Sequence, residues 1–422
     1  MNQMIKKRIE EINSGRVPEG YKNTVVGLCP TEWEEHTLSD FLQFKNGLNK
    51  EKSAFGSGTP IVNYTDVWKK RGLREKDIRG RVQLSQSEIK NYEAKEGDVF
   101  FTRTSETIDE IGFSSVMLDP VENTVFSGFV LRGRPYNDLV VKEFNQYCYS
   151  SDLMRNEIKK RSSITTRALT SGSMLSDVSI NLPTKTEQGK IAEILMKWDE
   201  MVELQDQYLK KLEIRKKAVM KKLLTPKADW ESVKLGKIAE MYAGGTPSTK
   251  NKEYWGGEIP WIQSGLIQNN YIELKNIDAR ITEKGLQNSS TAWIKKGSIL
   301  IAITGATCAN IAYLKCDATA NQSVMSITTD AANTLFLYFY MQNARLNLLA
   351  LQNGSAQGGL TLKYLENFDV YLPEIKQQNI IADILLTVDQ EISLQKEKLD
   401  KIKTQRKILK QYLLTGIVRV EE

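Results

Sequence analysis

Positive charge is concentrated in one short stretch of the chain, residues 69–81. The stretch reads KKRGLREKDIRGR and holds seven Lys or Arg residues against two acids, directly after Trp68. Basic side chains on loops suit contacts to phosphate, which position a nucleic acid without reading its sequence. Further basic residues of the same half are Arg103, Arg132, Arg134 and 159–161. A solvated charged face is the alternative, and the charge run alone leaves both interpretations open.

The second half is less basic and carries short loops of small polar residues. The stretches are AGGTPSTKNKEYW, IQSGLIQNN, ITGATCAN, TANQS and QNGSAQGG. Gln and Asn side chains can bind the edge of adenine through two hydrogen bonds, and Ser and Thr can donate to or accept from several bases. Ordinary turn chemistry explains most of the Gly and Ser residues in these loops. The loops are therefore candidates for recognition on a rigid scaffold.

Residue types needed for catalysis are scarce. His36 is the one histidine, which leaves little for a Ser-His-Asp or Cys-His site. We find no GxxxxGK[ST] phosphate loop, no GxGxxG and no Asn-Pro-Pro-Tyr stretch. A loose nuclease-like trace, Asp369 with Glu374 and Lys376, has no acidic match in the related stretch at 184–186. We predict no catalytic residue, no metal site and no cofactor bound by this chain.

Composition indicates an ordinary globular protein. The chain has 422 residues, 41% hydrophobic and 26% charged, with a net charge of +6, so it can form two or three domains and tolerate a polyanionic partner. No stretch approaches the ~18 consecutive apolar residues of a membrane span, and the charged start lacks the core of a signal peptide. The four cysteines form no CxxC pair, which favours free thiols. We expect a cytoplasmic protein without a membrane partner.

The chain contains an internal repeat. Residues 182–195 read LPTKTEQGKIAEIL and residues 372–385 read LPEIKQQNIIADIL, with seven of fourteen positions identical. The match continues without a gap at the same offset, so that Asp199 meets Asp389, Leu204-Gln205 meets Leu394-Gln395, and 223–225 meets 413–415. Weaker matches upstream keep the same order. This pattern is typical of a duplicated domain followed each time by the same element.

The repeated element is predicted to be a long helix. Residues 186–224 hold no Pro, and apolar residues recur at helical spacing from Ile191 onward. A helix of 39 residues would be ~58 Å long at 1.5 Å per residue. Two such helices can bury their apolar stripes by packing against each other as an antiparallel coiled coil. Gln205 and Gln395 lie in the middle of the stripes, where they either pair and fix the register or face a globular domain or solvent.

These patterns predict an α+β fold with pseudo-twofold repetition. Short β-branched or aromatic runs in both halves predict strands, namely 82–85, 97–104, 180–183, 297–304, 323–329 and 368–373, and helical patterns such as 334–353 intervene. The expected organisation is an N-terminal arm at 1–32, a first globular domain at 33–183, a long helix at 184–229, a second globular domain at 230–373 and a second long helix at 374–422.

The sequence resembles the specificity subunit of type I restriction-modification systems. GGTPSTKNKEYWGGEIPWIQSGLI at 244–267 resembles the opening of a target recognition domain of that family. The NQS at 321–323, the GSAQGGL at 354–360 and the twin helix starts are also similar, and the resemblance covers nearly the whole chain. The first domain departs from the pattern, because it has FKNGLNKEKSAFGSGTPIVNYTDVW at 44–68 and is similar to another subgroup.

The resemblance implies a non-catalytic DNA-recognition subunit. Each recognition domain would read one half of a split, asymmetric double-stranded DNA site, and the helices would set the gap. The helices would also dock two methyltransferase subunits, and restriction subunits are further candidate partners. S-adenosylmethionine, ATP and Mg are then expected in the partner subunits.

We select candidate residues on this basis. The predicted DNA contacts of the second half are Thr246, Ser248, Lys250, Ser264, Thr304, Gln322 and Gln357. Those of the first half are Lys69, Lys70, Arg71, Arg74, Arg79, Arg81, Arg103 and Thr104. For partner docking and the helix pair we select Gln188, Trp198, Asp199, Gln205, Gln378, Asp389 and Gln395, since a repeated polar residue beside an apolar stripe needs a role.

Two other classes of function remain open. One is a fused restriction-methylation enzyme, against which the missing methyltransferase and nuclease motifs argue. The other is a coiled-coil scaffold that does not bind DNA and whose globular halves bind protein. Salt dependence separates the scaffold from a DNA-binding protein, because phosphate contacts make affinity fall steeply with salt.

Overall fold

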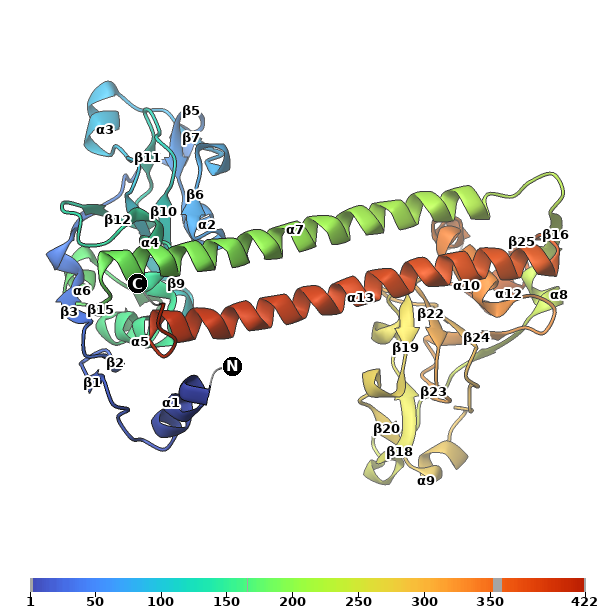
Figure 1. Cartoon of the computed structure of the whole chain (residues 1–422). Coiled ribbons are helices and arrows are strands. Elements are labelled where there is room, and N and C mark those ends of the chain that lie inside the picture. The colour runs from blue at the N-terminus through green and yellow to red at the C-terminus, as the bar shows by residue number, and fades with distance from the viewer. Residues whose placement is uncertain (1–2, 165, 352–358, 421–422) are drawn as a thin grey trace. The chain divides into compact units, whose positions relative to one another are not determined.

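The computed structural model describes residues 3–164, 166–351 and 359–420, and the chain forms two compact units (Figure 1). Unit 1 comprises Met1–Gln205 and Leu399–Glu422, and unit 2 comprises Asp206–Lys398. Each unit contains a globular part together with one stretch of each long helix.

Unit 1 is built around a five-stranded sheet of order β4-β12-β8-β10-β6, antiparallel except for the parallel pair β10 and β6. These strands are β4 (Leu42–Asn46), β12 (Val130–Pro135), β8 (Val99–Thr102), β10 (Ser114–Met117) and β6 (Gly72–Leu73). A three-stranded sheet holds β11 (Val125–Phe126), β5 (Phe55–Val62) and β7 (Gly80–Val82). The remaining strands are β1 (Tyr21–Asn23), β2 (Leu28–Pro30), β3 (Glu34–Thr37), β9 (Thr104–Ser105), β13 (Ser163–Ile164), β14 (Ala168–Leu169) and β15 (Ser179–Leu182).

Unit 2 repeats this topology. Its five-stranded sheet has the order β17-β24-β21-β22-β19, again antiparallel except for the last pair. These strands are β17 (Glu240–Ala243), β24 (Val324–Thr328), β21 (Ile299–Ala302), β22 (Ile311–Leu314) and β19 (Asn270–Ile272). A three-stranded sheet holds β20 (Arg280–Ile281), β18 (Trp255–Ile262) and β23 (Thr319–Ala320), and β16 (Glu231–Lys234) pairs with β25 (Asp369–Leu372) as β3 pairs with β15.

Each unit also contains short helices, several of which pack on the sheets, and two long helices complete the units. Unit 1 contains α1 (Gln3–Asn13), α2 (Tyr64–Lys69), α3 (Gln86–Asn91), α4 (Lys142–Asn145), α5 (Asp152–Arg161) and α6 (Gly172–Ser176). Unit 2 contains α8 (Leu235–Ile238), α9 (Glu283–Gln287), α10 (Thr334–Asn343), α11 (Arg345–Ala350) and α12 (Leu362–Glu366). The long helices are α7 (Lys185–Leu224) and α13 (Ile375–Leu414).

The apolar stripes of the long helices are buried as their spacing predicts. In unit 1, Ile191 and Leu195 of α7 join one core cluster with Leu413 of α13, and all three side chains are at most 1% exposed. In unit 2, Leu224 of α7 joins the core with Leu385 of α13. The helices run in opposite directions within each unit (Figure 1). The predicted α+β fold with two long antiparallel helices is confirmed.

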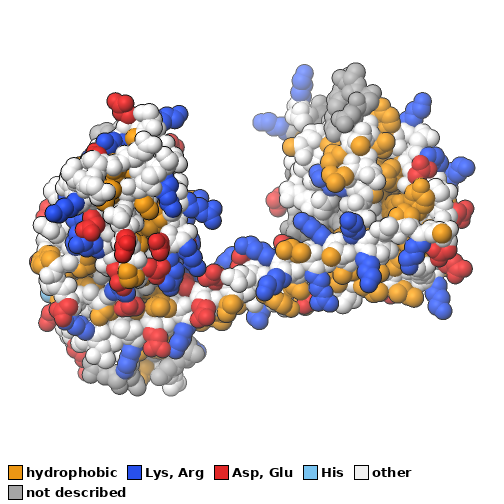
Figure 2. Space-filling model, turned by 90° about the horizontal axis from the view of Figure 1, so that it is seen from above, with side chains coloured by type: hydrophobic (Ala, Val, Ile, Leu, Met, Phe, Trp, Pro, Cys, Tyr) orange, Lys and Arg blue, Asp and Glu red, His pale blue; other side chains and the backbone are white. Residues whose placement is uncertain are grey.

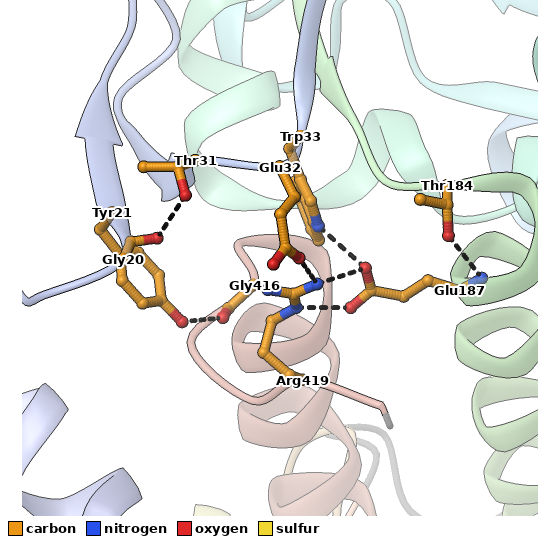
Figure 3. Close-up of polar contacts among 9 residues, drawn as sticks. All are labelled: Gly20, Tyr21, Thr31, Glu32, Trp33, Thr184, Glu187, Gly416 and Arg419. Carbon is orange, nitrogen blue, oxygen red and sulfur yellow. Dashed lines mark hydrogen bonds and ion pairs between the residues drawn. The ribbon is translucent and has the colours of Figure 1, made fainter. Parts of the chain in front are cut away.

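The buried carboxylate of Glu187 links the C-terminal segment to Trp33 within unit 1 (Figure 3). Glu187, in the first turn of α7, accepts from the indole Nε1 of Trp33 at 3.0 Å and from Nε of Arg419 at 2.8 Å. Arg419 also pairs with Glu32 at 2.7 Å. A buried charge is stable only when it is paired, so this network fixes the entry of α7 and the C-terminal segment together.

Two local predictions need correction. We expected a strand over 82–85, but β7 ends at Val82 because Ser85 instead caps α3 by accepting from the backbone N–H of Glu88. We also expected one helical run over 334–353, but the helix is interrupted at Ala344, between α10 and α11. No helix in the described part of the chain is long and apolar enough to cross a membrane.

Candidate nucleic-acid interface

The basic segment of unit 1 begins at the end of α2, passes through β6, an edge strand of the five-stranded sheet, and ends in β7, an edge strand of the three-stranded sheet. Several of its charges are engaged locally: Lys70 pairs with Asp77, Arg74 pairs with Asp119 at 2.8 Å, and Arg81 donates to the carbonyls of Ile78 and Gly80. Lys69 and Arg79 are exposed. The Arg74–Asp119 pair is half-exposed, and such ion pairs are worth about 0–1 kcal/mol, so a phosphate could replace Asp119 at small cost.

Arg71 differs from its neighbours, because it points toward the long helices. Its guanidinium is mostly buried, and burial followed by the nearby Arg406 lowers its pKa. Asp199 and Tyr147 act in the opposite direction and raise the pKa of Arg71. The structure therefore brings Lys69, Lys70 and Arg71 together but assigns them different environments.

Arg103 and Thr104 follow the C-terminal end of β8, more than twenty residues after the basic segment 69–81. Arg103 is half-buried, and its Nη1 donates to the carbonyl of Gly128 at 3.4 Å. Thr104 belongs to β9 and pairs with Leu169 of β14. Two apolar residues next to these strands are exposed, Phe129 at 63% and Ile164 at 64%. The carbonyl of Phe129 accepts from the backbone N–H of Arg103, and Ile164 pairs with Ala168 of β14. This end of unit 1 thus presents apolar and polar groups rather than a purely basic face.

The GGTPS loop of unit 2 is held tightly against β23. The Nε1 of Trp261 donates to the carbonyl of Gly245 at 3.0 Å, and the backbone N–H of Gly245 donates to Ala320. A Cβ on Gly244 would lie 2.3 Å from the carbonyl oxygen of Ala320, so the loop can approach this closely only with glycine. The loop places Thr246 beside Gln322, and the Thr246 hydroxyl donates to the Gln322 amide oxygen.

The other predicted contacts of unit 2 lie on separate loops. Ser248 uses its carbonyl to accept from Nε1 of Trp255 at 3.2 Å, and Lys250 is exposed. Ser264 begins the 3-10 turn η7 (Ser264–Leu266) that follows β18. Thr304 is exposed after β21. Gln357 lies outside the described residues.

The repeated glutamines tie each long helix to its own globular part. Gln188 accepts from the backbone N–H of Val141 at 3.0 Å and donates to the carbonyl of Pro183 at 3.0 Å. Gln378 makes the equivalent bonds to Asn333 and Pro373, at 2.9 and 2.8 Å. Their side chains are buried. The repeated sequence thus produces the same anchor in both units.

The repeated aspartates join the two long helices and a tyrosine. In unit 1, Asp199 pairs with Arg406 and accepts from the hydroxyl of Tyr147 at 2.8 Å. In unit 2, Asp389 pairs with Lys216 at 2.5 Å and accepts from the hydroxyl of Tyr271 at 3.0 Å. Burial, then the adjacent aspartate, raises the pKa of both phenols. Trp198, Gln205 and Gln395 are half-buried on the helices.

Sequence reasoning missed two sets of residues. The first set is Lys410 and Arg406 of α13, which lie near Arg71. The sequence holds one sign of it, because the position of Lys410 is occupied by Met220 in the other copy of the repeat. The second set is apolar and exposed on the long helices: Met196, Met201, Leu204, Tyr208, Ile214, Ile375, Ile380, Ile384, Leu394 and Ile408. The space-filling view shows hydrophobic side chains interleaved with Lys and Arg along the helices (Figure 2).

Comparison with known families decides what the two units are. A family model described as "Type I restriction modification DNA specificity domain" matches the chain twice, over residues 30–214 and 227–404. The chain belongs to this family. Each match joins one globular part to the long helix that follows it. The chain is therefore a DNA sequence-specificity subunit of a type I restriction-modification system.

A full-length relative carries the same description, and solved structures share the fold. The MjaX type I restriction enzyme specificity subunit of Methanocaldococcus jannaschii is 24% identical over 434 residues, covering 96% of this chain and 97% of the relative. The type I restriction-modification S subunit of M. genitalium has a TM-score of 0.56 at 15% identity, covering 90% of this chain and 96% of that one.

A second solved structure comes from work described as the structural basis of complex assembly and conformational transition of the type I R-M system. It has a TM-score of 0.62 at 16% identity, covering 92% of this chain and 99% of that one. At such identities the likeness shows the fold.

Proposed function

We propose that unit 1 and unit 2 each bind one half of a bipartite, asymmetric DNA site. The observation that carries this proposal is a shared scaffold with unlike loops. Both units have the same strand order. Residues 69–81 of unit 1 hold seven basic and two acidic residues, whereas the matching stretch of unit 2, residues 268–280, holds two of each. Like scaffolds can present themselves to DNA in a like way, while unlike loops favour different base sequences.

In unit 2 we propose that Gln322 reads an adenine. An amide can bind adenine through two bonds, donating from Nε2 and accepting at Oε1. An amide oxygen has two lone pairs, so it can keep the hydrogen bond from Thr246 and accept a second one from the base. Thr246 would then fix the orientation of the amide, and the exposed Lys250 of the same loop would contact phosphate.

In unit 1 we propose that the exposed basic residues bind the DNA backbone. Lys69 and Arg79 are exposed, and Arg74 is held only by a half-exposed ion pair with Asp119. These contacts would position unit 1 on the duplex. The sequence-reading contacts of unit 1 would come from the loops near Arg103 and Thr104, where exposed apolar side chains can contact thymine methyl groups.

We further propose that the long helices set the gap between the half-sites and dock methyltransferase subunits, with restriction subunits added to that complex. The exposed apolar residues of α7 and α13 support docking, because water-exposed apolar patches commonly mark protein interfaces. Leu204 and Leu394 occupy equivalent positions of the repeat and are 57% and 64% exposed, which favours two like partners. S-adenosylmethionine, ATP and Mg would be bound by those partners, and this chain would remain non-catalytic.

Selection of bound sequences tests the proposal. The chain in complex with its methyltransferase partner is incubated with a randomised duplex library, and the retained duplexes are sequenced. We expect two short fixed stretches separated by a gap of constant length and free sequence. Enrichment of one continuous motif, or retention that is independent of sequence while the complex is intact, would contradict the two-reader model.

A further inference from the structure

A cationic cavity lies in unit 1 between residues 67–71, α5 and the C-terminal part of α13. Its volume is about 370 Å³. Five of its lining residues are basic, namely Lys69, Lys70, Arg71, Arg155 and Lys410, and no described lining residue is acidic. A concave site of one charge sign raises the local concentration of counter-ions. The ligand suited to such a cavity is an anion.

Two buried guanidinium donors beside the cavity have no partner within the described part of the chain. They are Nη1 of Arg71 and Nε of Arg406. Buried donors are almost always satisfied in folded proteins, so an unsatisfied one needs an explanation such as a bound ion. The acids near these cations are Asp199, which is already engaged by Arg406 and Tyr147, Asp152 near Lys410, Asp109 near Arg155, and Asp77, which pairs with Lys70. The cluster therefore has more positive charge than the surrounding protein neutralises.

Lys410 is the least expected member of this cluster. Its side chain is 8% exposed, and its ammonium donates to the carbonyl of Ser150 at 2.8 Å. An ammonium has three donors, so it can also bind an anion. Burial, followed by Arg71 and Arg406, lowers the pKa of Lys410 to about 8. The protein therefore keeps a buried cation among other cations, which costs stability unless an anion binds there.

The other unit lacks this arrangement. The residue of α7 that matches Lys410 in the repeat is Met220. The groove beside Met220 is lined by Glu213, Glu273 and Asp389 as well as by basic residues. Packing of the repeated helix thus does not require a lysine at this position. Its presence in α13 points to a role in binding rather than in folding.

We propose that this cavity binds one phosphate group of the DNA backbone, with Arg71 and Lys410 as its principal ligands. Arg71 offers a planar pair of donors and Lys410 a point charge, a combination suited to the tetrahedral oxygens of a phosphodiester. A long repeat helix would then contact DNA directly, and only in unit 1. This inference rests on the proposed DNA-binding function, because the same chemistry would also accept free phosphate.

The test uses three variants of the full chain. Lys410→Met installs the side chain found at the equivalent position of α7 and is expected to fold, and Arg71→Gln removes the guanidinium. Lys403→Met is the control, because it removes an equal charge from an exposed position of the same helix. Duplex affinity of each variant, in complex with the methyltransferase partner, is measured from low to moderate salt. In a second arm, thermal melting compares sodium phosphate with sodium chloride at equal ionic strength.

We expect Lys410→Met to weaken DNA binding about tenfold at low salt, the scale of one lost charge-assisted hydrogen bond. The slope of log affinity against log salt should fall by about 0.9, as for one phosphate contact. Arg71→Gln should act in the same direction. Phosphate should raise the melting temperature of the wild-type and Lys403→Met chains but not of Lys410→Met.

Each other outcome overturns a defined part of the account. An unchanged DNA affinity and salt slope in Lys410→Met overturns the backbone assignment, and a phosphate effect that still requires Lys410 then identifies a site for free phosphate. Equal losses in Lys403→Met and Lys410→Met overturn the cavity and indicate general charge. A wild-type complex that binds no DNA refutes the proposed function, whereas the phosphate arm still tests the cavity.

Discussion

At the residue scale, the repeated polar side chains act inside their own units. Gln188 and Gln378 each bind a backbone N–H of the globular part and a proline carbonyl at the helix entry. Asp199 and Asp389 each hold a cation of the opposite helix and a phenol. These contacts explain why the polar residues repeat with the apolar stripe. Substituting the aspartates would therefore disturb the fold as well as any docking surface.

Lys410 leads to a prediction about pH. Its pKa is lowered to about 8 by burial, by Arg71 and Arg406 and by Lys407, against the opposing effect of Asp152. A lysine whose pKa is depressed on folding binds fewer protons in the folded state, so stability rises as pH increases from about 8 toward 10.5. Lys410→Met removes the penalty and should raise the free energy of unfolding at pH 7 by roughly 1–3 kcal/mol.

Denaturant unfolding of the full chain at pH 7 and pH 10 checks this expectation. The stability difference between Lys410→Met and wild type should shrink at pH 10, because the wild-type lysine is then largely neutral in the folded state. Lys403→Met should be close to wild type at both values. A difference of the same size at both pH values would contradict the buried, charge-crowded environment described for Lys410.

Sequence alone identifies part of this chemistry. The basic run at 69–81 and the GGTPS loop are visible as patterns, and the loop glycines are explained by contacts at 2.3 Å that admit no side chain. The sequence could not separate Arg71 from Lys70, because burial by α13 depends on tertiary packing. The difference between Lys410 and Met220 is visible in the repeat, but its significance depends on the neighbouring cations, which only tertiary packing brings together.

At the element scale, the long helices were the most predictable feature. Residues 186–224 were expected, and α7 spans Lys185–Leu224, because a long amphipathic pattern without proline fixes a helix almost by itself. The stripe that predicts burial also hides the opposite surface. Leu204 and Leu394 repeat in the sequence yet lie outside the stripe and are exposed, so their role had to come from the structure.

These leucines carry the prediction on docking. Burying a leucine at an interface contributes about 1.5–3 kcal/mol, so Leu204→Gln should weaken one methyltransferase contact by roughly 10- to 150-fold. Leu394→Gln should weaken the other. Mass measurement of purified complexes should find one methyltransferase in each single variant and none in the double variant.

The conservative pair Leu204→Met and Leu394→Met provides the control, because methionine keeps the apolar surface. Both positions are exposed in this chain, so the glutamine variants should melt close to wild type. Two methyltransferase subunits bound to the double glutamine variant would refute docking at this surface.

The length of the two long helices should determine the gap between the half-sites. Inserting seven residues after Gln205 in α7 and seven after Gln395 in α13 preserves the heptad spacing of the stripe. The insertion lengthens each helix by about 10 Å at 1.5 Å per residue, which corresponds to about three base pairs of duplex. Sequence selection should return the same two half-sites with a gap about three base pairs longer.

An insertion of seven residues in one helix only serves as the control, because it breaks the match between the two helices and should impair assembly. An unchanged gap in an assembled double-insertion complex would show that the helices do not set the spacing.

At the scale of the whole molecule, the repeat predicted the architecture better than any local pattern did. It indicated two globular parts and two helices in the right order, and both units have the same strand topology. The sequence did not reveal that each unit takes a stretch of both long helices, because that follows from which surfaces pack together. The unlike loops on this common scaffold are the reason to expect two different half-sites.

The assignment of one half-site to each unit is tested most directly by exchanging the globular part of unit 2. Residues 230–373 are replaced by the corresponding segment of another specificity subunit, and adenine methylation is mapped across the genome of a host that carries the chain with its methyltransferase. We predict a split motif in which one half changes and the other half and its methylation are retained. Change of both halves, or of neither while the exchanged complex is active, would contradict the assignment of one half-site to each unit.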